Sequence, residues 1–365
     1  MATASLASPI PRRIAVMRGI VLVGGEGTRL RPLTWRTRKQ LVSVLNRPLL
    51  DHLLLHLRAH GVDRVTLALT RRSDLIQRAY EDGARLGLAL DYAYEETPLG
   101  SGGAIASIAQ GWDEPFFVCN GDIITDLDLT AMWRSHQERA AVLSISLFEV
   151  EDPSAFGVAD LGEGFRIRRF VEKPKREDAP SLLINSGTWI FDPSLIAQMD
   201  PTTFHRVEER LFPDLCNAGK PVFGFDHSGG YWGDIGNPVA LLRVNLDLVQ
   251  GAIPARLIGV PVTHGVLVDA TATIDDGARI EGPAVIGAGT VVERGARVTS
   301  SVLWDGAHVG ANAVVRGSTV ATGARIEAGA TVEDAVIAHE AVVPAGAVVR
   351  GASVEPGTTF GGTAV

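Results

Sequence analysis

The sequence predicts an α/β protein built from two parts: a mostly parallel, Rossmann-like sheet covered by helices, and a parallel β-helix that follows it. Three observations support this prediction. The chain has 365 residues, which is long for one hydrophobic core and suits two domains. The first part alternates short apolar runs with longer amphipathic stretches, and from Val268 onward an apolar residue instead recurs at a short fixed period.

Four short apolar runs in the first part are predicted strands. They cover residues 20–23, 65–69, 116–119 and 141–148. Two longer stretches, 49–60 and 75–86, have apolar residues at helical spacing and are predicted helices. Strands that alternate with helices form a parallel sheet covered on both faces, and such sheets bind ligands at the carboxyl ends of their strands.

The repeat in the last part has a period of six residues. Its first apolar positions are Val268, Ile274, Ile280, Ile286, Val292 and Val298. From Leu303 the spacing becomes six, six, five, so that Leu303, Val320, Ile337 and Val354 are each 17 apart, one coil of a three-sided solenoid. The pattern resembles the hexapeptide-repeat family, and the resemblance implies a left-handed parallel β-helix. A run of short antiparallel strands is the alternative, but it gives no reason for a fixed period.

These patterns set the expected domain boundaries. We expect a loose N-terminal extension over 1–17, where Ala, Ser and Pro are frequent, a catalytic domain over 18–257 and the β-helix over 258–365.

Charge and composition exclude several classes of partner. The net charge is −8 with both signs mixed along the chain, so we expect neither a nucleic-acid partner nor a membrane partner. No segment approaches the roughly 18 apolar residues of a membrane span. The two cysteines, Cys119 and Cys216, form no disulfide framework and are expected to be small core residues, which fits a cytoplasmic location.

A Gly-rich turn follows the first predicted strand, in the sequence LVGGEGTRLRPLT at residues 22–34. Gly24, Gly25 and Gly27 leave room for backbone N–H groups to approach phosphate oxygens. The spacing completes neither a dinucleotide-binding fingerprint nor a P-loop. Arginines follow the turn, and Lys39 follows them.

GGEGTRLRPLT with Lys39 resembles the signature of the sugar-1-phosphate nucleotidylyltransferases, and the residues of the motif most resemble those of the mannose-1-phosphate guanylyltransferases. The resemblance implies that this loop cradles a triphosphate. It also implies that Arg29 holds the leaving pyrophosphate and that Lys39 neutralises charge near the α-phosphorus. Arg38 and Ser43 stand where the family usually has Pro, so we expect a less rigid loop around Lys39.

Three further motifs occur in the order of that family. PLGSGGA at 98–104 resembles the element that packs against the nucleobase and ribose. FRIRRFVEKPK at 165–175 alternates as an edge strand does, and the resemblance implies that Glu172 binds sugar hydroxyls and Lys173 the sugar phosphate. NSGTW at 185–189 resembles the sugar-binding turn.

Two aspartates are the predicted metal ligands. PFFVCNGD runs from a buried type of strand into Asp122, and a carboxylate at the carboxyl end of a parallel strand can hold Mg²⁺. GGYWGDIGNP resembles a further element of the family and supplies Asp234, 112 positions later. We expect both carboxylates to converge on one cation, whereas Asp126 and Asp128 are expected to cap the next turn.

The predicted site therefore has four groups of residues. The catalytic group is Arg29, Lys39 and Lys173; the nucleotide-binding group is Leu22, Gly24, Gly25, Gly27, Thr28, Arg29, Gly100, Ser101 and Gly121; the substrate-binding group is Glu172, Lys173, Asn185 and Gly187; and the metal ligands are Asp122 and Asp234.

The resemblance implies a magnesium-dependent enzyme that transfers a nucleoside monophosphate from a nucleoside triphosphate, GTP being favoured, to a sugar 1-phosphate such as mannose 1-phosphate, with release of pyrophosphate. Another base, or a heptose or cyclitol 1-phosphate, is an open alternative. A non-catalytic regulatory subunit of the family is a second. An acyltransferase in the β-helix would need an imidazole base, but the candidates His308 and His339 are expected to be surface residues. We also expect the β-helix to join subunits into a homo-oligomer.

Overall fold

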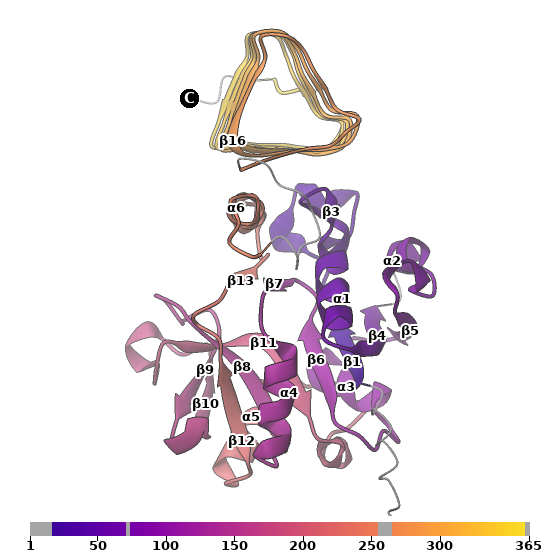
Figure 1. Cartoon of the computed structure of the whole chain (residues 1–365), viewed down its shortest axis with the longest axis vertical. Coiled ribbons are helices and arrows are strands. Elements are labelled where there is room, and N and C mark those ends of the chain that lie inside the picture. Colours follow the sequence, from indigo (N-terminus) through magenta and orange to yellow (C-terminus); the bar gives the residue numbers. More distant parts are fainter. Residues whose placement is uncertain (1–16, 71–73, 255–264, 362–365) are drawn as a thin grey trace, which may run out of the picture.

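The structure is a computed structural model that describes residues 17–70, 74–254 and 265–361. The expected boundary at 257/258 and residues 1–16 of the expected N-terminal extension lie outside these ranges. Figure 1 shows a sheet domain with flanking helices and, at one end of the molecule, a β-helix seen end-on as a triangle. The predicted fold class is thereby confirmed.

A nine-stranded mixed sheet forms the centre of the first domain. Its strands are β1 (Met17–Leu22), β4 (Val62–Thr70), β5 (Ala89–Glu95), β6 (Phe116–Asn120), β8 (Leu143–Glu149), β9 (Gly157–Leu161), β10 (Ile167–Glu172), β11 (Leu183–Phe191) and β12 (Val222–Asp226). The neighbours β5, β4, β1 and β6 are parallel. Beyond β6 the strand β11 runs antiparallel to β6, β8 and β9, and β10 lies at the predicted edge.

Helices cover both faces of this sheet. They are α1 (Leu49–Ala59), α2 (Asp74–Tyr80), α3 (Gly100–Ile108), α4 (Leu129–Glu138) and α5 (Leu211–Asn217), whereas α6 (Pro238–Val249) packs against the β-helix. One hydrophobic cluster packs α1, α2 and α4 on one face, and another packs α3 and α5 on the other. Asp128 caps α4 as predicted, because its Oδ1 accepts a hydrogen bond from Ala131 N at 2.9 Å.

The predicted helix over 75–86 is wrong in its second half. The helix ends at Tyr80, and Glu81 and Gly83 take positive φ angles of 48° and 83°. A residue with positive φ cannot continue a right-handed helix. Leu86 then lies in a short 3₁₀ helix (Ala84–Leu86), where it is still buried.

Two pairs of short strands form separate two-stranded sheets outside the nine-stranded sheet. These are β2 (Ser43–Val44) with β3 (Arg47–Pro48), and β7 (Ile123–Thr125) with β13 (Trp232–Asp234). Three 3₁₀ turns, Thr28–Leu30, Leu33–Trp35 and Lys39–Leu41, follow β1 before β2 begins.

The β-helix comprises the strands from β14 to β27. They are β14 (Val266–Val268), β15 (Thr273–Ile274), β16 (Arg279–Ile286), β17 (Val291–Val292), β18 (Arg297–Leu303), β19 (His308–Val309), β20 (Val314–Arg316), β21 (Thr319–Val320), β22 (Arg325–Ile326), β23 (Thr331–Glu333), β24 (Val336–Ile337), β25 (Val342–Val343), β26 (Val348–Arg350) and β27 (Ser353–Val354). All their pairings are parallel, and Leu303, Val320, Ile337 and Val354 stack in register. The coil of 17 residues is confirmed. The left-handed sense stays a prediction.

Val268 is an exception to the predicted inward positions, because it is 42% exposed. Its strand β14 pairs only with β16 among the described strands, so the first coil has a neighbouring coil on one side alone.

The two domains share one hydrophobic cluster. Leu30 and Leu33, from the turns after β1, pack in it together with residues of α6 and with Leu267, Val302 and Trp304 of the β-helix. Figure 1 shows α6 and the β2–β3 region beneath the triangle. No helix in the described ranges is both long enough and apolar enough to cross a lipid bilayer.

Candidate active site

A cleft opens at the carboxyl ends of β1, β4 and β5, where the parallel part of the sheet predicts a ligand site. Its volume is about 780 Å³, within the range of sites for nucleotide-sized ligands. Its walls include five predicted nucleotide-binding residues, namely Leu22, Gly24, Gly25, Gly100 and Ser101. Glu95, Phe204 and Arg206 also line it.

The glycines of the first loop serve different purposes. A Cβ atom at Gly25 would meet no protein atom within 4 Å, so the protein itself does not require a glycine at this cleft-lining position. Gly27 has a φ of 65°, and a Cβ there would lie 2.9 Å from Lys39 Cβ, so the turn requires glycine. Thr34 holds the same turn, since its hydroxyl donates to Gly27 O at 2.7 Å.

The two predicted metal ligands lie side by side. Asp234 is paired with Ile123 in the β7–β13 ladder, and Ile235 N donates to Asp122 O at 3.0 Å. Asp122 Oδ2 also accepts from Lys39 Nζ at 2.5 Å, and the Lys39 side chain is only 8% exposed. Two segments more than a hundred residues apart in sequence thus bring both carboxylates to one place.

Charge around Asp234 reflects this convergence. Burial and the neighbouring Asp122 carboxylate raise the pKa of Asp234, while Lys39 and Arg29 act in the opposite direction. A Cβ atom at Gly236 would lie 3.2 Å from Asp234 Oδ2 and 3.7 Å from Arg29 Nη1, which puts the guanidinium beside the carboxylate. The side chains of Asp122, Asp234, Lys39 and Arg29 therefore form one charged cluster next to the cleft.

Comparison with known families agrees with this geometry. The nucleotidyl transferase family model matches residues 18–251, and a model described as the GMPPB C-terminal domain matches residues 262–360. The chain belongs to the nucleotidyl transferase family.

The sequence similarity to relatives covers most of the length of this nucleotidyl transferase. The mannose-1-phosphate guanylyltransferase of Mycobacterium tuberculosis is 35% identical over 302 residues, covering 81% of this chain and 82% of the relative. The mannose-1-phosphate guanyltransferase beta-B of Xenopus laevis is 38% identical over 71% of this chain and 73% of its own. The crystal structure of HddC from Yersinia pseudotuberculosis complexed with GMP-PN has a TM-score of 0.54 at 28% identity, covering 64% of this chain and 99% of HddC.

Glu172 and Lys173 of this nucleotidyl transferase lie at the end of the edge strand β10. Lys173 Nζ is 3.2 Å from Glu172 Oε1, and the lysine side chain is 55% exposed. Glu172 Oε2 is buried and has no hydrogen-bond partner among the described residues. A buried carboxylate oxygen without a donor is costly, and a ligand hydroxyl would satisfy it.

The predicted sugar-binding turn interrupts the pairing of β11 with β8 between Asn185 and Trp189. Asn185 Oδ1 accepts from Gly187 N at 3.0 Å and from Trp189 Nε1 at 2.7 Å, so the side chain shapes its own turn. Gly187 has a φ of 82°, and a Cβ there would lie 2.3 Å from Ile123 Cδ1. The protein's own packing, beside β7, therefore requires this glycine.

The second Gly-rich turn is also shaped by packing. His205 N donates to Leu99 O at 3.0 Å, and Gly102 N donates to His205 O at 2.9 Å. Ser101 Oγ donates to Glu208 Oε2 at 2.8 Å and accepts from Val207 N at 3.0 Å. The glycines of PLGSGGA are thus needed to dock the 203–208 segment, while Gly100 and Ser101 still face the cleft.

Gly121 lies behind the cleft. Its N–H donates to Leu22 O at 3.0 Å, and a Cβ there would lie 2.6 Å from Val23 Cγ1. The glycine therefore lets the end of β6 approach β1 closely, which positions Asp122 one residue later.

Several cleft residues were missed from the sequence. Glu95 lines the cleft, accepts a hydrogen bond from Leu99 N at 3.1 Å, and has a pKa raised by burial. Its place three residues before Pro98, at the start of PLGSGGA, is a signal that sequence reasoning can use. Phe204 and Arg206 carry no such signal, since they follow about a hundred residues later without a recognisable motif.

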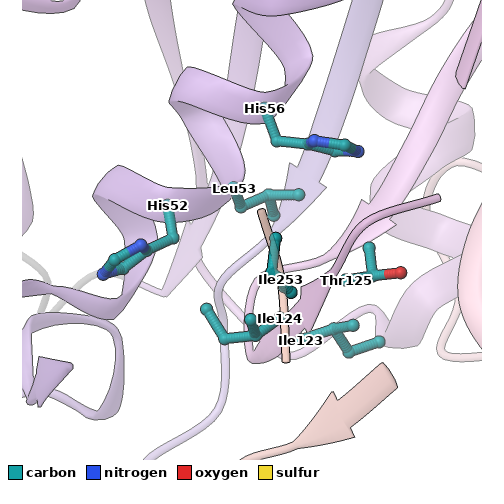
Figure 2. A pocket seen from close by; sticks show the side chains of 7 residues that line it. All are labelled: His52, Leu53, His56, Ile123, Ile124, Thr125 and Ile253. Carbon is teal, nitrogen blue, oxygen red and sulfur yellow. The ribbon is translucent and has the colours of Figure 1, made fainter. Parts of the chain in front are cut away.

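A small cavity behind β7 is not a substrate site. It lies between α1 and β7 and is lined mainly by apolar side chains with His52 and His56 (Figure 2). Its volume of about 20 Å³ is that of a single water molecule. The Nε2 atoms of His52 and His56 are bound to Val44 O at 2.9 Å and Leu127 O at 2.8 Å, and burial lowers the pKa of His56 to about 4.

Proposed function

We propose that this nucleotidyl transferase moves a nucleoside monophosphate from a nucleoside triphosphate to a sugar 1-phosphate, and that its substrates are GTP and mannose 1-phosphate or a close analogue. The observation that carries the proposal is the cluster of Asp122, Asp234, Lys39 and Arg29 beside the cleft. The names of the guanylyltransferase relatives and the GMP-PN complex of HddC support the choice of guanine.

The reaction needs little covalent chemistry from the protein. A phosphate oxygen of the sugar 1-phosphate attacks the α-phosphorus and forms a new P–O bond. The bond from the α-phosphorus to the oxygen that bridges to the β-phosphorus breaks, and pyrophosphate leaves with that electron pair. Direct displacement inverts the configuration at phosphorus and forms no enzyme-bound intermediate, so trapping a covalent nucleotidyl-enzyme would contradict the proposal.

Charge neutralisation is the main catalytic requirement. Two like charges ~4 Å apart repel by about 4 kcal/mol at an effective dielectric constant of 20, and both substrates are polyanions. Arg29 is proposed to hold the leaving pyrophosphate, Lys39 to neutralise the α-phosphate, and Lys173 to meet the sugar phosphate. The unpartnered Glu172 Oε2 is proposed to accept a hydrogen bond from a sugar hydroxyl.

The two aspartates fit Mg²⁺. They offer hard oxygen ligands, and no group of three or more His, Cys, Asp or Glu side chains in the described parts of the chain forms a closed metal cage. Mg²⁺ is commonly held by one or two carboxylates and by substrate phosphates, which matches a site with two aspartates beside a nucleotide cleft. When bound, the cation supplies further charge neutralisation at the phosphates.

The test is an assay of pyrophosphate release with each common nucleoside triphosphate against a panel of hexose, heptose and cyclitol 1-phosphates. We expect activity that needs Mg²⁺, is lost with a chelator, and is highest with GTP and mannose 1-phosphate. Higher activity with another base or acceptor would correct the specificity alone. No pyrophosphate with any pair would contradict catalysis and favour the regulatory subunit.

Two alternatives have less support. A regulatory subunit has no need for the charged cluster, yet all of its members are present. An acyltransferase base in the β-helix is disfavoured for His339, because its Nε2 is bound to Leu33 O of the first domain at 3.0 Å.

Assembly and location complete the proposal. A β-helix leaves flat outer faces that can stack, so we propose a homo-oligomer joined through it, which light scattering would test. The proposed location is the cytoplasm, where both substrates would be available.

A further inference from the structure

A histidine of the β-helix is hydrogen-bonded to the backbone of the loop of residues 27–39, which carries Arg29 and Lys39. His339 lies in the turn after β24, and its Nε2 is 3.0 Å from Leu33 O. A carbonyl oxygen only accepts hydrogen bonds, so Nε2 carries the proton and donates. The sequence predicted a surface residue, whereas His339 is half-buried against Leu33 and near the Trp304 ring, with ring centres 5.5 Å apart.

Leu33 belongs to the segment between the two basic residues of the proposed catalytic cluster. The next residue, Thr34, donates its hydroxyl to Gly27 O at 2.7 Å. Gly27 in turn is packed against Lys39, since a Cβ on it would lie 2.9 Å from Lys39 Cβ. A continuous series of contacts therefore runs from His339 of the β-helix through Leu33 and Thr34 to Gly27 of the Gly-rich turn, and from Gly27 to Lys39.

Other contacts cross this junction but do not hold the backbone of residues 27–39: Asn46 Nδ2 donates to Ile286 O at 2.9 Å, from the turn between β2 and β3. Arg36 pairs with Glu340, but their side chains are 45% and 67% exposed, and such surface pairs add little stability. The hydrophobic cluster around Leu33 stabilises the contact between the two domains, but apolar packing is not directional. The His339 bond is directional, and it is made to the backbone of the loop itself.

We propose that His339 is a positioning residue, through which the β-helix holds the loop of residues 27–39 in the geometry that catalysis requires. The proposal rests on the proposed function, because the loop carries Arg29 and Lys39. His339 contacts neither substrate, so its effect reaches the reaction only through the position of these two side chains. A small displacement of a positioning group can lower a rate by up to about 100-fold.

The first test compares His339→Ala with His339→Gln in the full chain. We expect His339→Ala to lower kcat by about 10- to 100-fold while KM for the sugar 1-phosphate changes less than about 2-fold, because Glu172 and Lys173 lie on a separate element. Gln keeps an N–H donor, so His339→Gln is expected to recover most of the loss. A kcat of His339→Ala within about 2-fold of the native value, or an equal loss in both variants, would overturn the proposal.

His308→Ala is the matched control. It removes an imidazole of the same β-helix that is bound to Glu293 and not to the first domain. We expect native kcat in this variant. An equal fall in kcat would mean that any lost imidazole disturbs the β-helix, and would also overturn the proposal.

A measurement without substrate separates this proposal from the proposed function. Amide hydrogen exchange should become faster in residues 27–39 of His339→Ala and stay unchanged in residues 100–108. Unchanged exchange in 27–39 would refute the positioning role. Absent activity in the native chain would instead refute the proposed function and leave the exchange result interpretable.

Discussion

At the scale of single residues, the site combines charges that destabilise the folded chain. Asp122 and Asp234 lie together, and burial with the charge of Asp122 raises the pKa of Asp234. For an acid with a raised pKa, the folded state binds more protons than the unfolded state between the two pKa values. Stability therefore falls as pH rises above about 4, the ordinary pKa of aspartate, and the loss persists at neutral pH.

Asp234→Asn is expected to separate stability from activity. Removing the charge should raise the melting temperature at pH 7 without divalent cations, while turnover falls at least about 100-fold. The native protein should also melt at a higher temperature when Mg²⁺ is added, and the variant should not. Calorimetry with and without Mg²⁺, together with the pyrophosphate assay, measures all three effects.

Asp113→Asn is the control, since Asp113 is an exposed residue. It should leave turnover, melting temperature and the response to Mg²⁺ unchanged. Near-native turnover of Asp234→Asn in Mg²⁺ would show that the metal assignment is wrong.

Glu172→Gln tests the sugar side of the site. The variant keeps the shape but loses the charge of the unpartnered oxygen, and a hydrogen bond to a charged group is worth about 1.5–3 kcal/mol. We expect KM for the sugar 1-phosphate to rise about 10- to 100-fold with KM for the nucleotide unchanged. Glu177→Gln, at an exposed position five residues later, should change neither. A rise in the nucleotide KM alone would move Glu172 to the other substrate.

Which site residues the sequence could predict depends on where they lie in it. Asp122 follows a buried strand and Asp234 lies in a motif, so both were predicted, and the structure brings them together. Phe204 and Arg206 reach the cleft because the 203–208 segment docks on the N-terminal end of α3, and no local sequence pattern indicates that docking.

At the scale of elements, the first turn of α3 is the structural link between the cleft and the 203–208 segment. Gly100 has a φ of 68°, and a Cβ on it would lie 2.5 Å from His205 O. Gly111 has a φ of 75° but no neighbour within 4 Å of such a Cβ. Alanine substitutions at these two glycines therefore separate the cost of backbone strain, which both share, from the cost of a steric clash, which only Gly100 has.

We expect Gly111→Ala to lower the free energy of unfolding by about 1–2 kcal/mol, the strain of a left-handed residue, and Gly100→Ala to lower it further. Because Gly100 lines the cleft, its variant should also raise KM for the nucleotide. Urea denaturation and initial rates measure the two effects. Equal losses of stability would show that the 203–208 segment yields to the added methyl group.

Elements were predictable where one periodicity dominates. The β-helix has a strict repeat, so its coil of 17 residues was predicted correctly. The helix over 75–86 was predicted too long. The helical spacing of apolar residues continues past Glu81, but the positive φ of Glu81 ends the helical backbone. The antiparallel pairing of β11 with β6 and β8 was not predicted, since strand direction depends on long-range pairing.

At the scale of the whole molecule, the two domains share one hydrophobic cluster. Sequence periodicity identified the inward residues of the β-helix but not the outer face that docks on the first domain, because docking depends on both surfaces. Trp304 lies in this face, and its side chain is 3% exposed. Its Nε1 is buried without a partner among the described residues.

Trp304→Ala is expected to uncouple the two domains. The substitution should lower stability by about 3–5 kcal/mol, and the single calorimetric transition expected for the native chain should split into two. Trp304→Phe keeps an aromatic ring, leaves a smaller cavity than Ala and removes an N–H without a partner, so it should retain one transition with a smaller loss of stability than Trp304→Ala. Two transitions in the native chain would mean that the shared cluster does not couple the domains. One transition in Trp304→Ala would mean that contacts such as the His339 bond suffice without the indole.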